Sequence, residues 1–158
     1  MSKIYVDEIA GIASPSTVAI PGHVIQVVSN SVQDSSTAIS TLTWVNMVQV
    51  TITPTSATSK IYLQASGCFY MAATGTLSTA IFKNGSSVKT TGNGWLGYNK
   101  HDVSNNHRDT ITHIYMDTAG STSSITYSFQ AYVDTAGSGT EYGASGTPTI
   151  ITAMEIAG

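Results

Sequence analysis

Apolar and polar residues alternate along much of this chain with a period of two, which is the spacing of side chains on one face of an extended strand. The clearest stripe lies in Ser124–Val133, where every second residue is apolar. No window shows the i, i+3, i+4, i+7 apolar spacing over the roughly 10–12 residues that a helix requires. The pattern therefore predicts an all-β protein.

The same periodicity defines the expected strands of a globular body. They are His23–Ser29, Trp44–Thr53, Lys60–Met71, Ser78–Lys83, Ser86–Thr90, Asp109–Met116, Ser124–Val133 and Thr149–Ile156. Long connections are expected at Ser29–Thr43 and Thr91–Arg108. Short strands at regular spacing predict an antiparallel β-sandwich of about eight strands, of jelly-roll type.

Three local signals refine this prediction. Asn84 and Gly85 join two strands and predict a type I′ hairpin, because both central positions of that turn need a positive φ. His23–Ser29 is a nearly continuous apolar run, which is typical of a buried strand. Gly67 interrupts a long strand and is expected to form a bulge.

The first 22 residues are predicted to form an arm separate from the body. Lys3–Ile9 alternates weakly, and Gly11–Gly22 contains two prolines and reads as an extended linker. The expected organisation is an arm and linker over residues 1–22 and a β-sandwich body over residues 23–158. The arm residues expected to contact a partner, by adding a strand to it, are Ile4, Tyr5, Val6 and Ile9.

Charge is scarce, which narrows the classes of partner. Charged residues make up 9% of the chain and the net charge is −3, so no basic surface for nucleic acid or anionic membranes is expected. The chain has no apolar run of about 18 residues and no signal peptide, which predicts synthesis in a cytoplasm and no membrane insertion. With few Lys and Glu to protect its edges, the sheet is expected to bury them between copies of the chain.

Motifs for catalysis fail in their context. Gly92–Gly97 matches G-x-G-x-x-G, but no parallel strand and helix flank it to hold a pyrophosphate. Ala144–Gly146 lacks the spacing of a nucleophile elbow, and Asp7 and Glu8 lie on opposite faces of a strand. Cys68, the single cysteine, is interpreted as a structural thiol. The chain is therefore predicted to be no enzyme and to need no cofactor.

One segment is rich in histidine, which is a common metal ligand in proteins. His101, His107, Asp109 and His113 fall within 13 residues, but their spacing matches no established zinc pattern. The prediction is a polar loop without metal.

Two further segments have competing interpretations. Gly92–Arg108 sets Trp95, Tyr98 and Asn99 among glycines, which is typical of a recognition loop, and these three are the predicted partner-binding residues. The alternative is an Ω-loop whose tryptophan folds back onto the core.

Asp-Thr-Ala-Gly-Ser occurs at Asp117–Ser121 and again at Asp134–Ser138, and is read as a turn in which Asp bonds its own backbone.

Four short runs carry a resemblance to a known class of proteins. They are Pro21–Val27 (PGHVIQV), Ile52–Ile61 (ITPTSATSKI), Ala80–Gly85 (AIFKNG) and Ile151–Gly158 (ITAMEIAG). In these runs the chain resembles small virion surface proteins of tailed bacteriophages, with marine and cyanobacterial phages the nearest likeness. The resemblance implies a jelly-roll body similar to the tumour-necrosis-factor and C1q type, commonly trimeric, on the surface of a virion.

Two functions follow from this resemblance. The first is a capsid decoration or cement protein, a homotrimer bound to the major capsid protein or another virion protein. The second is a tail-fibre or receptor-binding tip that recognises a host cell-surface glycan or protein. The shortness of the chain favours the first, because a fibre tip usually belongs to a longer polypeptide with a shaft.

Overall fold

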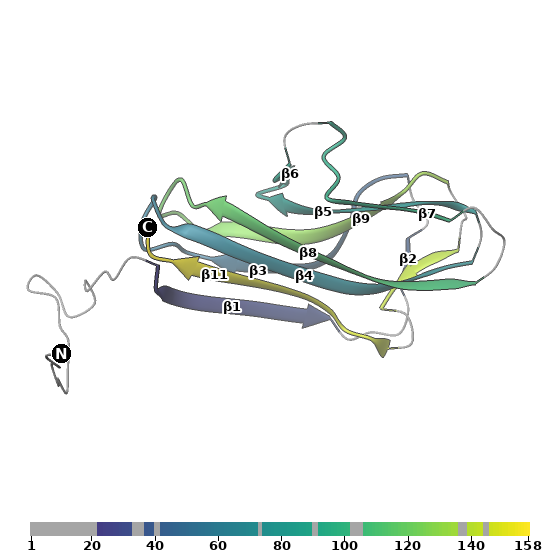
Figure 1. Cartoon of the computed structure of the whole chain (residues 1–158), viewed down its shortest axis with the longest axis horizontal. Coiled ribbons are helices and arrows are strands. Elements are labelled where there is room, and N and C mark those ends of the chain that lie inside the picture. Colours follow the sequence, from purple (N-terminus) through teal and green to yellow (C-terminus); the bar gives the residue numbers. More distant parts are fainter. Residues whose placement is uncertain are drawn as a thin grey trace, which may run out of the picture.

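The computed structural model describes residues 22–32, 37–39, 42–72, 74–89, 92–101, 106–135, 139–143 and 146–158. These residues form eleven strands and no helix, and every strand pair is antiparallel. The strands run along the long axis of the molecule in two layers (Figure 1). The prediction of an all-β antiparallel sandwich is confirmed.

Sheet A has six strands. They are β1 (Val24–Val32), β2 (Thr37–Ile39), β4 (Lys60–Met71), β8 (His107–Thr118), β10 (Thr140–Tyr142) and β11 (Thr149–Ile156). The main order is β1-β11-β4-β8. The short strand β10 pairs with β4 beyond the residues of β4 that pair with β11, and β2 pairs with β10. Strands β10 and β2 therefore continue the positions, or rows, of β11 and β1 in the sheet.

Sheet B has five strands. They are β3 (Val45–Ile52), β5 (Gly75–Lys83), β6 (Ser86–Ser87), β7 (Gly97–His101) and β9 (Ile125–Val133). The order is β3-β9-β5, and β6 and β7 pair with opposite ends of β5.

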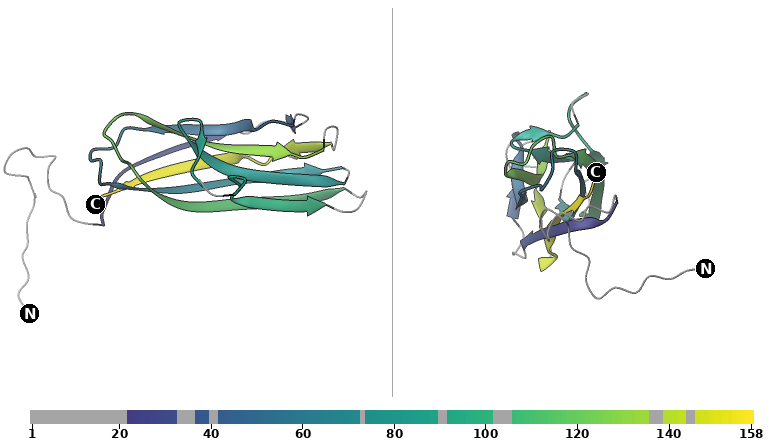
Figure 2. Two further views of the ribbon diagram at one scale, coloured as in Figure 1. Left: turned by 90° about the horizontal axis from the view of Figure 1, so that it is seen from above. Right: turned by 90° about the vertical axis from the view of Figure 1, so that its left-hand side faces the viewer.

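The eleven strands thus occupy eight rows, which matches the predicted number. Along the chain the long strands pass from one sheet to the other, in the sequence β1, β3, β4, β5 and then β8, β9, β11. This alternation gives the connectivity of a jelly roll. Figure 2 shows the two layers from above and from the end of the molecule.

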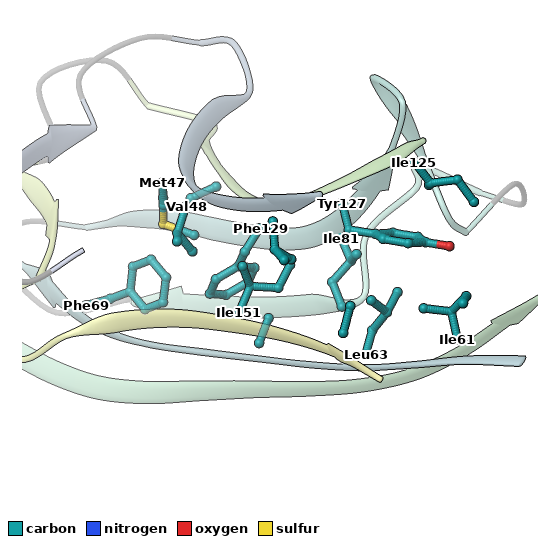
Figure 3. Close-up of a cluster of buried hydrophobic side chains, with 14 of the residues drawn as sticks. Met47, Val48, Ile61, Leu63, Phe69, Ile81, Ile125, Tyr127, Phe129 and Ile151 are labelled. Atoms are coloured by element: carbon teal, nitrogen blue, oxygen red, sulfur yellow. The ribbon is translucent and has the colours of Figure 1, made fainter. Parts of the chain in front are cut away.

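The core lies between the two sheets and is filled by the inward side chains of both. Phe69 of β4 meets Phe129 of β9 edge to face, with ring centroids 6.2 Å apart. The side chains that contact each other there come from both layers (Figure 3). The largest fully buried apolar ones are Ile39, Ile52, Ile61, Leu63, Phe69, Met71, Leu77, Ile81, Tyr127, Phe129 and Ile151.

One predicted local feature is confirmed and two are wrong. Asn84 and Gly85 have φ values of 48° and 83°, as a type I′ turn requires. Gly67 forms no bulge, because β4 pairs with β8 in continuous register; an added Cβ there would lie 3.3 Å from the side chain of Thr149. Strand β1 is an edge strand and is largely exposed, not buried.

A single buried carboxylate ties together the end of the sandwich where β1 begins. Glu155 of β11 accepts hydrogen bonds from the backbone N–H and the hydroxyl of Thr55, both at 2.7 Å, and from Gln26 Nε2 at 2.6 Å. Burial raises the pKa of Glu155, but these hydrogen bonds outweigh it and hold that pKa below its ordinary value. The carboxylate therefore joins β1, β11 and the connection between β3 and β4.

Candidate assembly surface

The outward face of sheet A carries an apolar row that crosses all four of its long strands. The register places Val27 of β1 beside Met154 of β11, Met154 beside Tyr62 of β4, and Tyr62 beside Met116 of β8. Directly opposite residues in adjacent strands point to the same face. We call these four residues the apolar row.

Further apolar side chains extend this row. Ile114 lies two residues from Met116 on β8, and Ile150 stands on β11 beside Ser66. Ile114 is 64% exposed, Val27 53%, Met116 50% and Ile150 38%. Large apolar side chains gathered on one face at this exposure make this face the candidate interaction surface of the molecule.

The middle of this face lacks charge. Lys60 stands at one end, where its ammonium donates to the hydroxyl of Thr118 at 2.8 Å. At the other end Arg108 lies over the ring of Tyr70, 5.1 Å from its centroid, and Glu141 pairs with Tyr70. Between these ends, the described outward residues of β4 and β8 are apolar, hydroxyl-bearing, amide or thiol side chains.

On the inward face of β8, the polar side chains of His113 and Asp117 alternate with Ile111 and Tyr115 and form hydrogen bonds to the other sheet. His113 Nε2 and Thr79 Oγ1 of β5 are 2.7 Å apart, and burial lowers the pKa of this histidine below 6.5. The hydroxyl of Tyr127 donates to Asp117 at 2.6 Å, and burial followed by this bond raises the pKa of Tyr127. These contacts keep a neutral imidazole and a protonated phenol between the layers.

Asp117 of β8 and Lys83 of β5 form an ion pair between the two sheets. Lys83 Nζ lies 2.7 Å from Asp117 and donates to the carbonyls of Thr118 and Ala119 at 2.9 and 3.1 Å. The ammonium is thereby fully engaged and positioned to hold a turn, not to attack a substrate. Asp117 bonds across the sandwich, which corrects the prediction that it caps its own turn.

The predicted recognition loop is partly a strand. Tyr98 and Asn99 lie in β7, where their backbones pair with Ser78 and Leu77 of β5. Trp95 is half-buried and its ring stacks on that of Tyr98, with centroids 5.3 Å apart and planes 21° apart; Tyr98 is 56% exposed.

The structure brings Trp95 and Tyr98 together, whereas the backbone of Asn99 lies one residue further along β7. Among the described residues of this loop, Leu96 packs against the core, whereas Trp95 stacks on Tyr98, unlike the alternative that placed Trp95 on the core. The predicted arm contacts, Ile4, Tyr5, Val6 and Ile9, lie outside the described residues and stay predictions.

Neither a metal site nor a membrane span is found in the part of the chain that the structure describes. No group of three or more His, Cys, Asp or Glu side chains is placed to hold a metal ion there. His113 points into the sandwich, while His107 is exposed at the far end of β8. No described helix is long and apolar enough to cross a bilayer.

Sequence reasoning missed the apolar row and its neighbours. The signal was present in β8, where Ile111 and Tyr115 follow one phase of the alternation and Ile114 and Met116 the other. Apolar residues in both phases of an edge strand indicate that it presents apolar side chains on its outer face as well as toward the core. The same reading explains the apolar run of β1, in which Val28 faces the core and Val27 the outer face.

No protein-family model matches the chain, and no curated protein matches it in sequence. The residues of the chain itself therefore carry the functional argument.

Proposed function

We propose that this chain is a non-enzymatic structural protein of a bacteriophage virion, a decoration or cement protein that acts as a homotrimer on the outside of the head. The observation that carries the assembly part of this proposal is the outward face of sheet A. It presents Val27, Ile114 and Met116 at 50% exposure or more in a region whose middle lacks charge.

The chemistry of that face favours contact with another copy of the chain. Subunit interfaces between identical chains are more apolar than ordinary protein surfaces, and charged residues are depleted at their centres. The apolar row, together with Ile114 and Ile150, supplies an apolar region without charge, and the charged Lys60, Arg108 and Glu141 stand at the two ends of the face. A polar rim around an apolar middle is the usual layout of a stable interface.

The virion part of the proposal rests on the sequence resemblance. Two of the four similar runs, Ile52–Ile61 and Ile151–Gly158, meet at the hydrogen bonds between Thr55 and Glu155. These runs therefore form one local structure, which gives a physical reason for their occurrence together.

A charge placed in the apolar row tests the assembly. In sedimentation, the natural chain should run at three times its mass of 16.5 kDa. Ile114→Lys and Met116→Lys should each weaken association at least about a hundredfold, because an ammonium would be buried without a partner. Thr51→Lys, on the exposed outer face of sheet B, is the matched control and should leave the trimer intact.

A stable monomer of the natural chain at micromolar concentration would exclude the trimer. Labelled protein distributed over the head of a particle would support decoration, whereas label at a single vertex would indicate a tail role.

A second function, the receptor-binding tip, is favoured by one observation. Tyr98 is exposed and stacks on Trp95, and the loop that holds them is anchored to β5 by bonds from Val88 N–H to Ile81 and from Leu96 N–H to Thr79, both 3.0 Å. A rigid aromatic pair of this kind suits recognition of a glycan or protein.

The double variant Trp95→Ala/Tyr98→Ala separates the two functions. For a cement protein in which this loop of sheet B also contacts a neighbouring subunit or the shell, we expect a weaker trimer or particle with normal adsorption. For a receptor-binding tip, we expect unchanged melting and particle stability with reduced adsorption to host cells.

A further inference from the structure

Four rows of strands form the edges of the two sheets, and three of them are protected against pairing. Strand β1 has a register shift between Val24 and Gln26, and β3 has one between Asn46 and Val48. The third edge is divided between β6, of two residues, and β7, of five. Bulges and short strands are the usual means by which proteins blunt a sheet edge.

The fourth edge, β8, is unprotected. It has 12 residues and pairs with β4 from end to end without a register shift. The segment Thr110–Met116 contains no Lys, Pro or bulge, and the charges of β8 lie outside it. Among the described residues β8 is hydrogen-bonded as a strand to β4 alone. Along Thr110–Met116, the backbone groups on its other side form an edge that no described strand covers.

We propose that this free edge binds the segment Lys3–Ile9 of a neighbouring copy as an additional antiparallel strand. The proposal rests on the proposed assembly of copies and names the surface that the arm of each copy binds. Main-chain hydrogen bonds supply the affinity in this mode of recognition, and alternate side chains fill the two faces of the extended sheet.

The side chains of the arm fit an edge with apolar residues on both faces. In an extended Lys3–Ile9, Ile4 and Val6 point to one face, and Tyr5 and Ile9 to the other. On β8, Ile111 and Tyr115 face inward and pack against the core, while Ile114 and Met116 face outward and are exposed. A strand beside β8 would thus meet apolar neighbours on both of its faces.

Geometry favours the edge of a neighbour over the chain's own edge. Gly22 donates to the carbonyl of Ala157, at the end of sheet A where β8 finishes. From there, an arm that followed its own β8 would run parallel to it, unlike all described pairs of the sheet. Antiparallel pairing of Lys3–Ile9 with its own Thr110–Met116 would require the linker to turn back along about 26 Å of β8 and to cross about 19 Å, which is four strand spacings. The 12 residues before Gly22 reach at most about 43 Å, so the linker would be reversed in direction and largely stretched, whereas binding to a neighbour does not impose this reversal.

Disulfide trapping between full-length chains tests this proposal. One partner carries Val6→Cys, the other carries a cysteine at Thr110, Thr112 or Ile114, and both carry Cys68→Ser. The two chains are refolded together and oxidised with oxidised glutathione. We expect a disulfide-linked heterodimer with at least one of the three positions. Thr51→Cys, on the outer face of sheet B, is the control and should give none.

Amide hydrogen exchange provides a second readout. Val6→Pro removes a backbone donor from the arm, and amides in Thr110–Met116 should then exchange at least about tenfold faster than in the natural chain. An intact oligomer with no cross-link and no change in exchange would overturn the inference and leave the proposed function standing. A chain with both cysteines that forms only an intrachain disulfide would also overturn it. A natural chain that is monomeric throughout would remove the proposed assembly itself.

Discussion

At the scale of single residues, Glu155 is the acidic group on which the structure depends most. It is the one carboxylate among the described residues that is fully buried, and it receives three hydrogen bonds from Gln26 and Thr55. Replacement by Gln keeps the shape but puts an amide donor where an oxygen now accepts. We expect Glu155→Gln to lower the free energy of unfolding at pH 7 by about 1.5–3 kcal/mol, measured in urea.

The difference in stability between the natural chain and Glu155→Gln should depend on pH in a defined direction. Because the pKa of Glu155 is depressed in the folded chain, its stabilising contribution is present above the ordinary value of 4.5 and is lost as the pH falls through the folded pKa. The natural chain and the variant should therefore converge in stability at acid pH. Glu141→Gln, at a half-buried position on β10, is the matched control and should show a smaller difference. A constant gap at every pH would contradict this explanation.

Gly97 leads to a second prediction at this scale. A Cβ added there would lie 2.6 Å from Cε1 of His113 and 2.7 Å from Oγ1 of Thr79. The close approach of β7 to the contact between His113 and Thr79 therefore depends on glycine. We expect Gly97→Ala to destabilise the fold by about 1–3 kcal/mol through overpacking. Gly67→Ala, with its nearest contact at 3.3 Å, should be milder in thermal melting. Equal effects of both variants would contradict the steric explanation.

Individual roles were predictable from the sequence where they depend on local chemistry. Cys68 is a half-buried free thiol, as expected of a lone cysteine in a strand. The partners of Asp117 were not predictable, because Lys83 and Tyr127 come from other strands and only the fold brings them together. Contacts between residues far apart in the sequence cannot be predicted from local patterns.

At the scale of elements, the hairpin between β5 and β6 shows how a turn also connects to a third strand. Asn84 N–H donates to the carbonyl of Thr126, and Asn84 Oδ1 accepts from the N–H of Thr126, both at 2.9 Å. The turn thus continues the ladder between β5 and β9. Gly85 has a φ of 83° within this arrangement.

Gly85→Ala should therefore weaken the hairpin without changing its contacts. An added Cβ at Gly85 meets no atom within 4 Å, so the cost is the left-handed backbone alone. We expect about 1 kcal/mol of destabilisation in chemical denaturation. Gly146→Ala, also at positive φ in open space, should cost a similar amount. A neutral Gly85→Ala would show that the turn relaxes to another type.

Strand predictions were accurate for alternating segments and poor for the others. Strand β7 was hidden because Gly97–His101 contains few apolar residues and pairs only at the edge of β5. Strand β1 was expected to be buried because its apolar residues occupy both phases, although one phase faces outward. Composition alone does not tell whether an apolar side chain of a strand faces the second sheet or the outer surface.

At the scale of the whole molecule, the scarcity of charge predicts how assembly responds to salt. Charged residues are 9% of the chain, and the middle of the outward face of sheet A lacks them. We expect the association constant to change less than about threefold between low salt and about 0.5 M salt, because screening acts on charges. Sedimentation at several ionic strengths measures this. A steep salt dependence would place the contacts at Lys60 and Arg108.

The sandwich and its eight rows were predictable because turns and alternation are local signals. The position of the candidate assembly surface was not predictable, since it depends on which strands become neighbours in sheet A. Val27, Met154, Tyr62 and Met116 are scattered along the sequence and form a row only through the register of four strands.

The pairing of β1 with β11 has a consequence for biosynthesis. Val24 of β1 lies opposite Ile156 of β11. The first described strand therefore cannot pair with its neighbour in the sheet until the last strand has been synthesised. A ribosome must therefore complete β11 and expose it beyond the exit tunnel before sheet A closes, and loop closure over such a separation is slow. The outward face of sheet A, the candidate assembly surface, is complete only after β11 has joined the sheet, so the proposed assembly with other copies would follow synthesis of the last described strand.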